Sequence, residues 1–268
     1  MSRGFLWFCQ NSANVDYVEC SRALAQSIKK HNRENTICVI TDENSRFQDP
    51  NVDVIKVLKN DDSETHSIKW ANEHKAFQQS PFTHTIKLES DMLWTQNTDW
   101  WWNYLGQHDL VFSVDVRDYK DRVIKDITYR KLFFKNNLPN IYNGLTYFRR
   151  SQRALTFYKI CERLTLNWEY VRDNFLINCH DDYPSTDVIY ALAYRIMDPT
   201  CEQLIDYEWF KFVHHKPAIH GLDYVSNYND YLLPLRIEDN IMLGAHKLDR
   251  VWHYVNKKTV EDLNARIF

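Results

Sequence analysis

The amino-acid sequence predicts an α/β fold with a mostly parallel central sheet flanked by helices. Short apolar runs that are typical of buried strands alternate with segments whose apolar residues recur at helical spacing. This β-α-β alternation favours parallel strands that are joined by helical crossovers. The chain has 268 residues, which is enough for one large domain, and no low-complexity linker divides it. We therefore expect a single domain over residues 1–268.

Four of the expected strands lie in the first part of the chain. The expected strands are 4–9, 36–41, 52–57 and 85–94, and the expected helices are 17–28 and 68–79. Asn14 is the expected N-cap of the first helix, because its side chain can accept a hydrogen bond from the first turn. Polar loops start at Gln10 and at Asp42, directly after two of these strands. In a parallel sheet such loops open onto one edge, where ligands bind.

The rest of the chain continues this alternation. We expect a helix over 99–105 and strands over 110–115 and 141–148, the second of which is interrupted by Asn143-Gly144. An ordinary Asn-Gly turn is the alternative interpretation of this pair. Pro184-Ser185-Thr186-Asp187 is expected to open a further helix. Two more strand ends carry histidines, at 212–217 and at 251–258.

Two carboxylates stand at the end of the expected strand 85–94. Glu89 and Asp91 are two residues apart, so on a straight strand they point to the same face, roughly 6–7 Å from each other. That separation suits one direct metal ligand and one contact through water or sugar. Carboxylate oxygens favour Mg²⁺ or Mn²⁺, which keep positions open for phosphate oxygens. The alternative is an acidic strand end that enters a polar loop.

The charge pattern does not predict a general affinity for nucleic acid. The formal net charge is −3. Between 117 and 135, however, seven basic residues stand against three acidic ones. A solvated helix face is one interpretation of this segment, and a surface that contacts phosphates is the other. The candidate phosphate contacts are Arg117, Lys120, Arg122, Lys125, Arg130 and Lys131.

The cysteine pattern and the apolar runs indicate in which cellular compartment the protein is expected. Six cysteines are scattered without a C-x-x-C pair, so neither a zinc site nor a disulfide framework is expected. The apolar run near the N-terminus is too short for a signal peptide, and no segment reaches the roughly 20 apolar residues of a membrane span. We expect a cytoplasmic protein with no membrane span.

In this order the features resemble the GT-A glycosyltransferases, most closely the retaining branch of glycogenin-like and galactosyltransferase-like enzymes. Leu88-Glu89-Ser90-Asp91 is similar to the Asp-x-Asp strand of that fold, with Glu89 in place of the first Asp. Tyr142-Asn143-Gly144 resembles its Asn-Ser-Gly turn, without the Ser. His253-Tyr254, with a lysine soon after it, loosely resembles its His-aromatic-x-Gly-x-x-Lys element, without the Gly.

The resemblance implies a Rossmann-like GT-A domain with a nucleotide-binding half, 1–95, and an acceptor-binding half, 96–268, whose C-terminal extension closes the active site. It implies Mn²⁺ or Mg²⁺, held by Asp91 and Glu89, with His253 or its rival His214 as third ligand. The other implied site residues are Cys9, Gln10 and Asn11 for the nucleotide, Lys216 or Lys257 for the diphosphate, and Asp187, Asn143 and the further acids Asp182 and Asp115 for the sugar and the acceptor hydroxyl.

The function expected from this resemblance is transfer of a sugar from a UDP-linked donor to a hydroxyl group. The strands that carry the histidines also look similar to sugar transferases encoded by tailed bacteriophages. In that case the acceptor would be a hydroxylated pyrimidine in DNA, and the protein would act in the host cytoplasm. A glycan or protein acceptor is the alternative. A nucleotidyltransferase, which usually has a Gly-rich phosphate loop, and a non-catalytic nucleic-acid-binding module are the rival functions.

Overall fold

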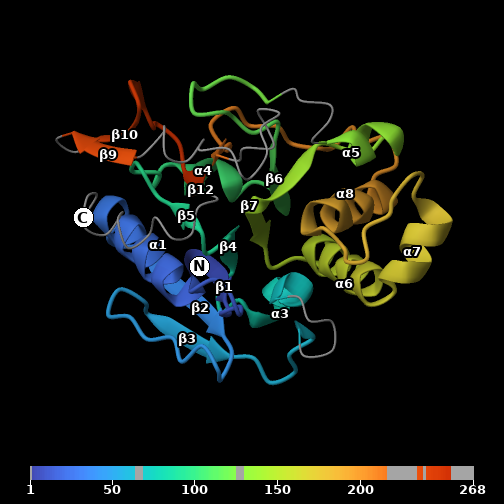
Figure 1. Ribbon diagram of the computed structural model, residues 1–268, viewed down its shortest axis with the longest axis horizontal. Coiled ribbons are helices and arrows are strands. Elements are labelled where there is room, and N and C mark those ends of the chain that lie inside the picture. Colours follow the sequence, from blue (N-terminus) through green and yellow to red (C-terminus); the bar gives the residue numbers. More distant parts are fainter. Residues whose placement is uncertain (1, 64–68, 125–129, 216–233, 238–239, 255–268) are drawn as a thin grey trace.

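The computed structural model describes residues 2–63, 69–124, 130–215, 234–237 and 240–254. Its centre is a six-stranded sheet in the order β3-β2-β1-β4-β7-β6 (Figure 1). The strands are β1 Arg3–Cys9, β2 Thr36–Thr41, β3 Val54–Val57, β4 His84–Leu88, β6 Leu110–Val114 and β7 Ile141–Arg149. β1 to β4 pair in parallel, and β7 runs antiparallel between β4 and β6. The predicted mostly parallel sheet is confirmed.

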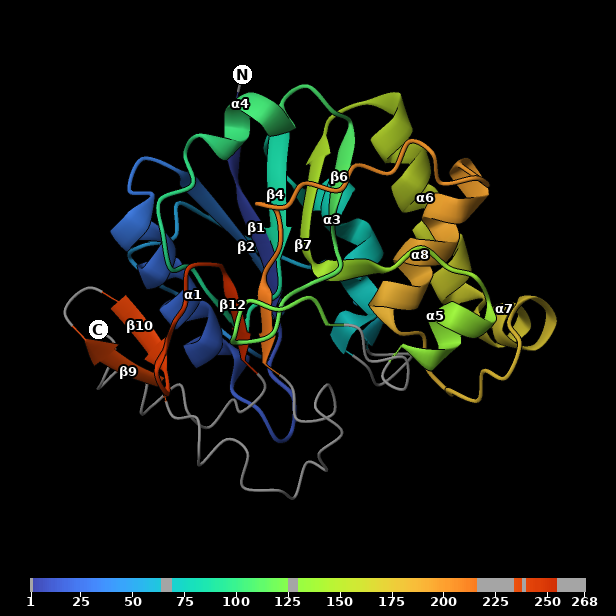
Figure 2. The same ribbon diagram turned by 90° about the horizontal axis from the view of Figure 1, so that it is seen from above.

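Helices cover both faces of this sheet, as Figure 2 shows. Successive side chains of a strand point to opposite faces, and β1 follows this rule. Phe5 and Trp7 pack with Leu24 and Ile28 of α1, whereas Leu6 and Phe8 belong to the core under α6 and α8. The helices are α1 Tyr17–His31, η1 Lys69–Lys75, α3 Ala76–Gln79, α4 Trp101–Leu105, α5 Lys131–Lys135, α6 Gln152–Leu166, α7 Trp168–Phe175 and α8 Thr186–Met197.

The start of α1 differs from the prediction. Asp16, not Asn14, is the N-cap, and its side chain accepts hydrogen bonds from the backbone N–H groups of Val18 and Glu19. Both residue types are good N-caps, so local sequence does not separate them. Asn11 supplies a further acceptor, because its Oδ1 lies 3.1 Å from the same Val18 nitrogen.

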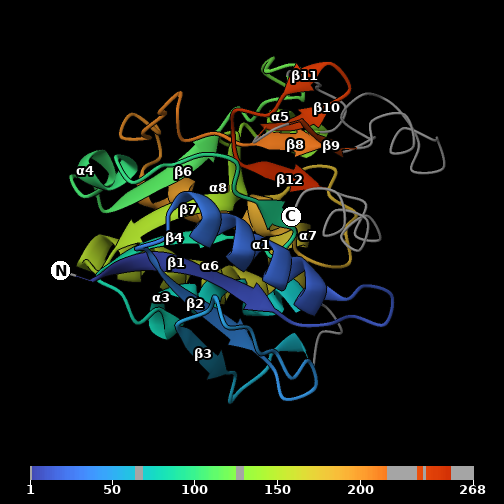
Figure 3. The same cartoon turned by 90° about the vertical axis from the view of Figure 1, so that its left-hand side faces the viewer.

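The expected strand 85–94 is broken in two. β4 ends at Leu88, the chain turns through Ser90 and Asp91, and Met92–Leu93 forms β5 in a different sheet. β5 pairs antiparallel with β12 (Trp252–Tyr254), and β12 pairs in parallel with β8 (Val213–His215). Figure 3 shows these C-terminal strands lying over the edge of the main sheet. The prediction of one straight strand was therefore wrong, because pairing with residues far along the chain redirects it.

A second small sheet consists of β9 Pro234–Ile237, β10 Asn240–Leu243 and β11 His246–Lys247, in the order β11-β10-β9. Asn143-Gly144 lies within β7 and is not a turn. On the β6 side, Tyr142 pairs with Ser113, but the next pair joins Thr146 to Phe112. Three residues of β7 are thus unpaired there, which makes a bulge. Within the described residues no helix is long and apolar enough to cross a membrane.

Candidate active site

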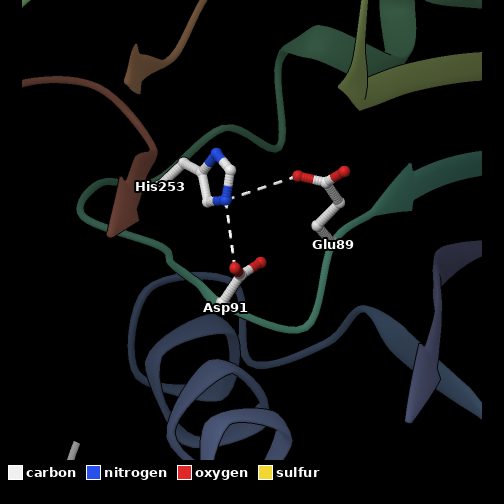
Figure 4. A group of neighbouring side chains, drawn as sticks. All are labelled: Glu89, Asp91 and His253. Carbon is white, nitrogen blue, oxygen red and sulfur yellow. Dashed lines mark ion pairs between the residues drawn. The ribbon is translucent and has the colours of Figure 1, made fainter. Parts of the chain in front are cut away.

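Glu89, Asp91 and His253 come together at the carboxyl end of β4 (Figure 4). His253 Nε2 lies 3.1 Å from Asp91 Oδ2 and 3.4 Å from Glu89 Oε2. One ligand atom from each residue lies within 4.8 Å of the other two. Two carboxylate oxygens and one imidazole nitrogen are a donor set that suits Mn²⁺, and Mg²⁺ with more difficulty because it prefers oxygen. The three side chains fit a divalent metal ion.

The break between β4 and β5 creates this convergence. On a straight strand the two carboxylates would stay roughly 6–7 Å apart. The turn at Ser90–Asp91 instead brings them to one point, and β5 then places Met92 opposite His253 on β12. The Tyr254 nitrogen donates a hydrogen bond to the Asp91 carbonyl oxygen at 3.2 Å. The C-terminal strand is therefore part of the site, and the pairing of β12 with β5 is what brings the predicted ligand His253 to the two carboxylates.

The rival histidines of the sequence interpretation have different positions. His253 faces the carboxylates, whereas His214 lies behind it, with the two Nδ1 atoms 2.8 Å apart. Both rings are buried. A hydrogen bond to the far nitrogen of a metal-binding histidine fixes its tautomer and ring orientation. This arrangement gives His253 the position of a ligand and His214 the position of its supporting partner.

Asn143 and Gly144 lie directly beside Glu89. The Asn143 side chain is fully buried, and its Nδ2 donates to Glu89 Oε1 and to Thr186 Oγ1, each at 3.2 Å. A Cβ atom on residue 144 would lie 3.2 Å from Glu89 Oε2, which is tight contact. The bulge in β7 thus brings an amide donor and a bare backbone against the carboxylate. These contacts point to a role of both residues in holding Glu89.

Asp187 is linked to the cluster through Asn143. Its Oδ1 accepts a hydrogen bond from the Asn143 nitrogen at 2.7 Å, and its Oδ2 accepts one from Arg130 at 2.6 Å. Arg130 is itself 5% exposed and also donates to Asn140 and to the Ile141 carbonyl. The guanidinium therefore balances the Asp187 charge. Asp115 accepts from Asn140 Nδ2 at 2.6 Å, which links it to the same group.

The three residues proposed for the nucleotide lie at the end of β1, which is Cys9, and in the loop that follows it. Cys9 is buried, and burial raises the pKa of its thiol to about 12, so it stays protonated at neutral pH. Gln10 Nε2 donates to Asp42 and Asp61, while its Oε1 accepts from Asn72. The Asn11 nitrogen donates to Ser45 Oγ. These bonds tie together the loops after β1 and β2, as the parallel topology predicts.

The structure does not bring every predicted residue to the cluster. The side chain of Asp182 is 87% exposed, and the ion pair recorded for it joins Arg172 on α7, 3.7 Å away. Lys216, Lys257 and Lys125 lie outside the described residues. Asp182 therefore has no described contact with Glu89, Asp91 or His253.

The basic segment is largely balanced by acids. Arg117 pairs with Glu208, and Arg122 pairs with Asp118 at 2.7 Å. Arg130 is buried against Asp187 and cannot reach a DNA backbone, so that part of the sequence interpretation was wrong. Lys120 and Lys131 are exposed.

Sequence reasoning missed three residues near the cluster. Lys87 is 0% exposed, pairs with Glu73 of η1 and donates to Asn143 Oδ1 at 2.8 Å. A lysine between Ile86 and Leu88 in a buried strand was the available signal. Tyr17 on α1 is the third residue. Burial, first of all, and the charges of Asp91 and Glu89 raise the pKa of its hydroxyl.

Two solved structures resemble the whole chain. Mouse xyloside xylosyltransferase 1, in its apo form, matches with a TM-score of 0.52 and 12% sequence identity, over 96% of this chain and 98% of the other. The galactosyltransferase LgtC, in complex with donor and acceptor sugar analogues, matches with a TM-score of 0.53 and 12% identity, over 99% and 96%. No protein-family description and no curated protein matches the sequence. At 12% identity the likeness concerns the fold, and the chain has the GT-A fold.

Proposed function

We propose that this protein is a metal-dependent glycosyltransferase that moves a sugar from a nucleotide diphosphate donor, UDP-linked, to a hydroxyl acceptor. The observation that carries the proposal is the Glu89, Asp91 and His253 cluster at the carboxyl end of β4 in a GT-A fold. In open α/β sheets, ligands bind at this edge. A divalent ion held there would neutralise the charge that develops on the leaving diphosphate.

In this proposal each side chain of the cluster has a distinct task. Asp91 and His253 act as direct ligands, because Asp91 Oδ2 and His253 Nε2 lie 3.1 Å apart and face the same point. Glu89 presents Oε2 to that point, while Asn143 holds its other oxygen. His214 keeps the His253 ring oriented. Asp187, neutralised by Arg130, anchors the Asn143 backbone and is not proposed as a base.

The donor and acceptor halves, 1–95 and 96–268, are part of the same proposal. Gln10 and Asn11 hold the loops that would border the nucleotide. Lys216 or Lys257 would contact the diphosphate, and both lie outside the described residues. All six cysteines are free, which agrees with the proposed cytoplasmic location.

For the acceptor we favour a hydroxyl of a glycan or protein over a hydroxylated pyrimidine in DNA. A DNA acceptor needs cations that are available to phosphates. Three of the five described candidates, Arg117, Arg122 and Arg130, already face carboxylates. The basic segment therefore offers little unbalanced positive charge to a DNA backbone.

Thermal unfolding with ligands tests the proposed function. We expect Mn²⁺ together with UDP or a UDP-sugar to raise Tm, since a ligand that binds only the folded state stabilises it. At a concentration of about 100 times Kd the gain is about 2.7 kcal/mol. Other nucleotides should give smaller shifts. Asp91→Asn should abolish the part of the shift that depends on Mn²⁺.

The matched control is Asp173→Asn, which changes an exposed carboxylate on α7 that pairs with Arg172. It should leave the Mn²⁺-dependent shift intact. An unchanged shift in Asp91→Asn would contradict the proposed metal site. Selective stabilisation by a nucleoside triphosphate with Mg²⁺ would favour a nucleotidyltransferase, and absence of any nucleotide effect would favour a non-catalytic module.

A further inference from the structure

The buried lysine of β4 needs an explanation. Lys87 is 0% exposed, and its ammonium group pairs with Glu73 and lies 6.0 Å from the centroid of the Tyr190 ring. Burying an ion pair usually costs about as much free energy as its attraction returns, and apolar residues of similar size often stabilise a fold equally well. Stability alone therefore does not account for a charged pair at this place.

The contact between Lys87 and Asn143 supplies a reason. A carboxamide can be turned over with almost no change of shape, so packing does not choose between its oxygen and its nitrogen. An ammonium group is only a donor. Because Lys87 Nζ lies 2.8 Å from Asn143 Oδ1, the oxygen must face the lysine, and Nδ2 is then directed at Glu89 and Thr186.

This choice matters for the orientation of Glu89. With the amide turned over, Asn143 Oδ1 would face Glu89 Oε1, and two acceptors would repel each other. In the observed orientation Asn143 Nδ2 holds Oε1 at 3.2 Å, and Glu89 Oε2 lies 3.4 Å from His253 Nε2. The bare backbone of Gly144 borders the same Oε2 atom. The oxygen that faces the cluster is thus set by a chain of contacts that begins at Lys87.

We propose that Glu73 and Lys87 are positioning residues that hold Glu89 in its metal-binding orientation through the Asn143 amide. Glu73 is the acidic partner of the lysine ammonium group, so the relay orients Glu89 without an unpaired cation beneath the acidic cluster. The relay spans η1, β4 and β7, which meet only in the folded chain. This inference rests on the proposed function in that Glu89 serves a metal ion.

The test replaces the ion pair by apolar residues of similar length. Lys87→Met with Glu73→Met removes both charges at once, so no buried charge is left without its partner. We expect the double variant to fold, and its Mn²⁺ affinity, measured by isothermal titration calorimetry with the metal alone, to fall about tenfold, as for other residues that orient metal ligands. In the crystal structure of the metal-free double variant, the Glu89 carboxylate should be displaced.

A second variant covers the case in which the first does not fold. Lys87→Gln with Glu73→Gln keeps polar groups, but Gln offers both donor and acceptor to Asn143, so residue 87 no longer selects the amide orientation. We expect a loss of Mn²⁺ affinity here too. Lys211→Met is the control, because Lys211 is also buried, at 4% exposed, and pairs with Asp206 and Glu208 away from the cluster. It should bind Mn²⁺ like the wild type.

The outcomes separate the relay from the proposed function. A folded double variant with wild-type Mn²⁺ affinity and an unmoved Glu89 overturns the relay and leaves the glycosyltransferase proposal intact. If the wild-type protein does not bind Mn²⁺, the proposed function fails, and the position of Glu89 in the double variant then decides on the relay alone. A change in unfolding free energy without a change in Mn²⁺ affinity would show that Glu73 and Lys87 only stabilise the fold, which also overturns the relay.

Discussion

The acidic cluster of Glu89, Asp91 and His253 and the basic segment 117–135 were both candidate binding sites in the sequence. In the structure their charges are arranged in opposite ways. In the cluster, Glu89 and Asp91 carry like charges and converge until their ligand atoms lie within 4.8 Å. In the basic segment, each buried or half-buried arginine meets an acid, as Arg117 meets Glu208 and Arg130 meets Asp187. Like charges that converge cost free energy unless a cation joins them, whereas alternating charges need no ligand.

This difference gives a criterion for recognising a binding site, which a count of charged residues does not give. Seven basic residues against three acids between 117 and 135 suggested an anion site, and two carboxylates suggested a metal site. Only the second group is held in place by residues without charge, such as Asn143, which donates a hydrogen bond to Glu89, and Gly144, whose bare backbone borders the same carboxylate. A site is indicated where the fold forces like charges together, rather than where charged residues are numerous.

Of the substitutions that follow, the one that crowds Glu89 should have the largest effect on Mn²⁺ affinity. Gly144→Ala would place a Cβ atom 3.2 Å from Glu89 Oε2, 3.2 Å from Phe212 Cζ and 3.3 Å from Met92 Cε. Because Phe212 is packed in the core, we expect the carboxylate to give way, with about a tenfold loss of Mn²⁺ affinity by calorimetry. The overpacking should also lower the unfolding free energy by about 1–3 kcal/mol.

Gly106→Ala is the matched control for that experiment. Its Cβ atom would lie 3.1 Å from the Trp102 carbonyl oxygen, so it is crowded too, but at the end of α4 and away from the cluster. It should lower the unfolding free energy and leave Mn²⁺ affinity unchanged. Equal Mn²⁺ affinity in wild type and a folded Gly144→Ala variant would contradict the role given to the bare backbone.

The fold was largely predictable because its main sheet is made of short, continuous apolar runs. β1, β2, β6 and β7 lie where those runs are, and they are buried along almost their whole length. The helices α6 and α7 and the sheet β11-β10-β9 were not predicted. The break of strand 85–94 could not be predicted, since it depends on pairing between Met92 and His253, 161 positions apart.

The candidate site was predictable only where its residues are close together in the sequence. Glu89 and Asp91 are close in sequence, so their pairing was visible, although the turn that makes them converge was not. The choice between His214 and His253 needed tertiary contacts, because each lies at the middle of a buried strand of three residues. The role of Lys87 was hidden because its partners, Glu73 and Asn143, come from two other elements.

A smaller effect is expected for a substitution in the basic segment, where the described acids already have basic partners nearby. Asp118 accepts hydrogen bonds from the backbone nitrogens of Lys120 and Arg122 and from the Arg122 guanidinium, between 2.7 and 2.9 Å. Burial alone would raise the pKa of Asp118, but these hydrogen bonds outweigh it and lower the pKa. Asp118→Asn should therefore lower the unfolding free energy by about 1–2 kcal/mol at pH 7, measured by urea denaturation, and leave Mn²⁺ affinity unchanged.

The pH dependence of that difference follows from the direction of the shift. A carboxyl group whose pKa is lower in the folded state stabilises the fold above its unfolded pKa, about 3.9, and loses this contribution as pH falls through its folded pKa. The gap between wild type and Asp118→Asn should be equal at pH 7 and pH 5 and should shrink below about pH 4. A gap that closes already between pH 7 and pH 5 would contradict this account.

The smallest effect is expected for the basic residues that remain after the ion pairs are counted. Among the described residues of the basic segment, the candidates Lys120 and Lys131 form no ion pair with a carboxylate, and neither does the exposed Lys135, so these lysines are what a DNA interface could use. Lys120→Gln with Lys131→Gln should change duplex DNA binding, measured by fluorescence anisotropy, by less than about twofold, because a few exposed lysines whose neighbouring arginines are paired with acids do not make a phosphate-binding surface. If instead the wild type binds DNA and the variant lowers the slope of log K against log salt by about 1.8, as the loss of two phosphate contacts requires, the basic segment is an interface after all. The contrast between converging and balanced charges would then fail as a criterion for this protein.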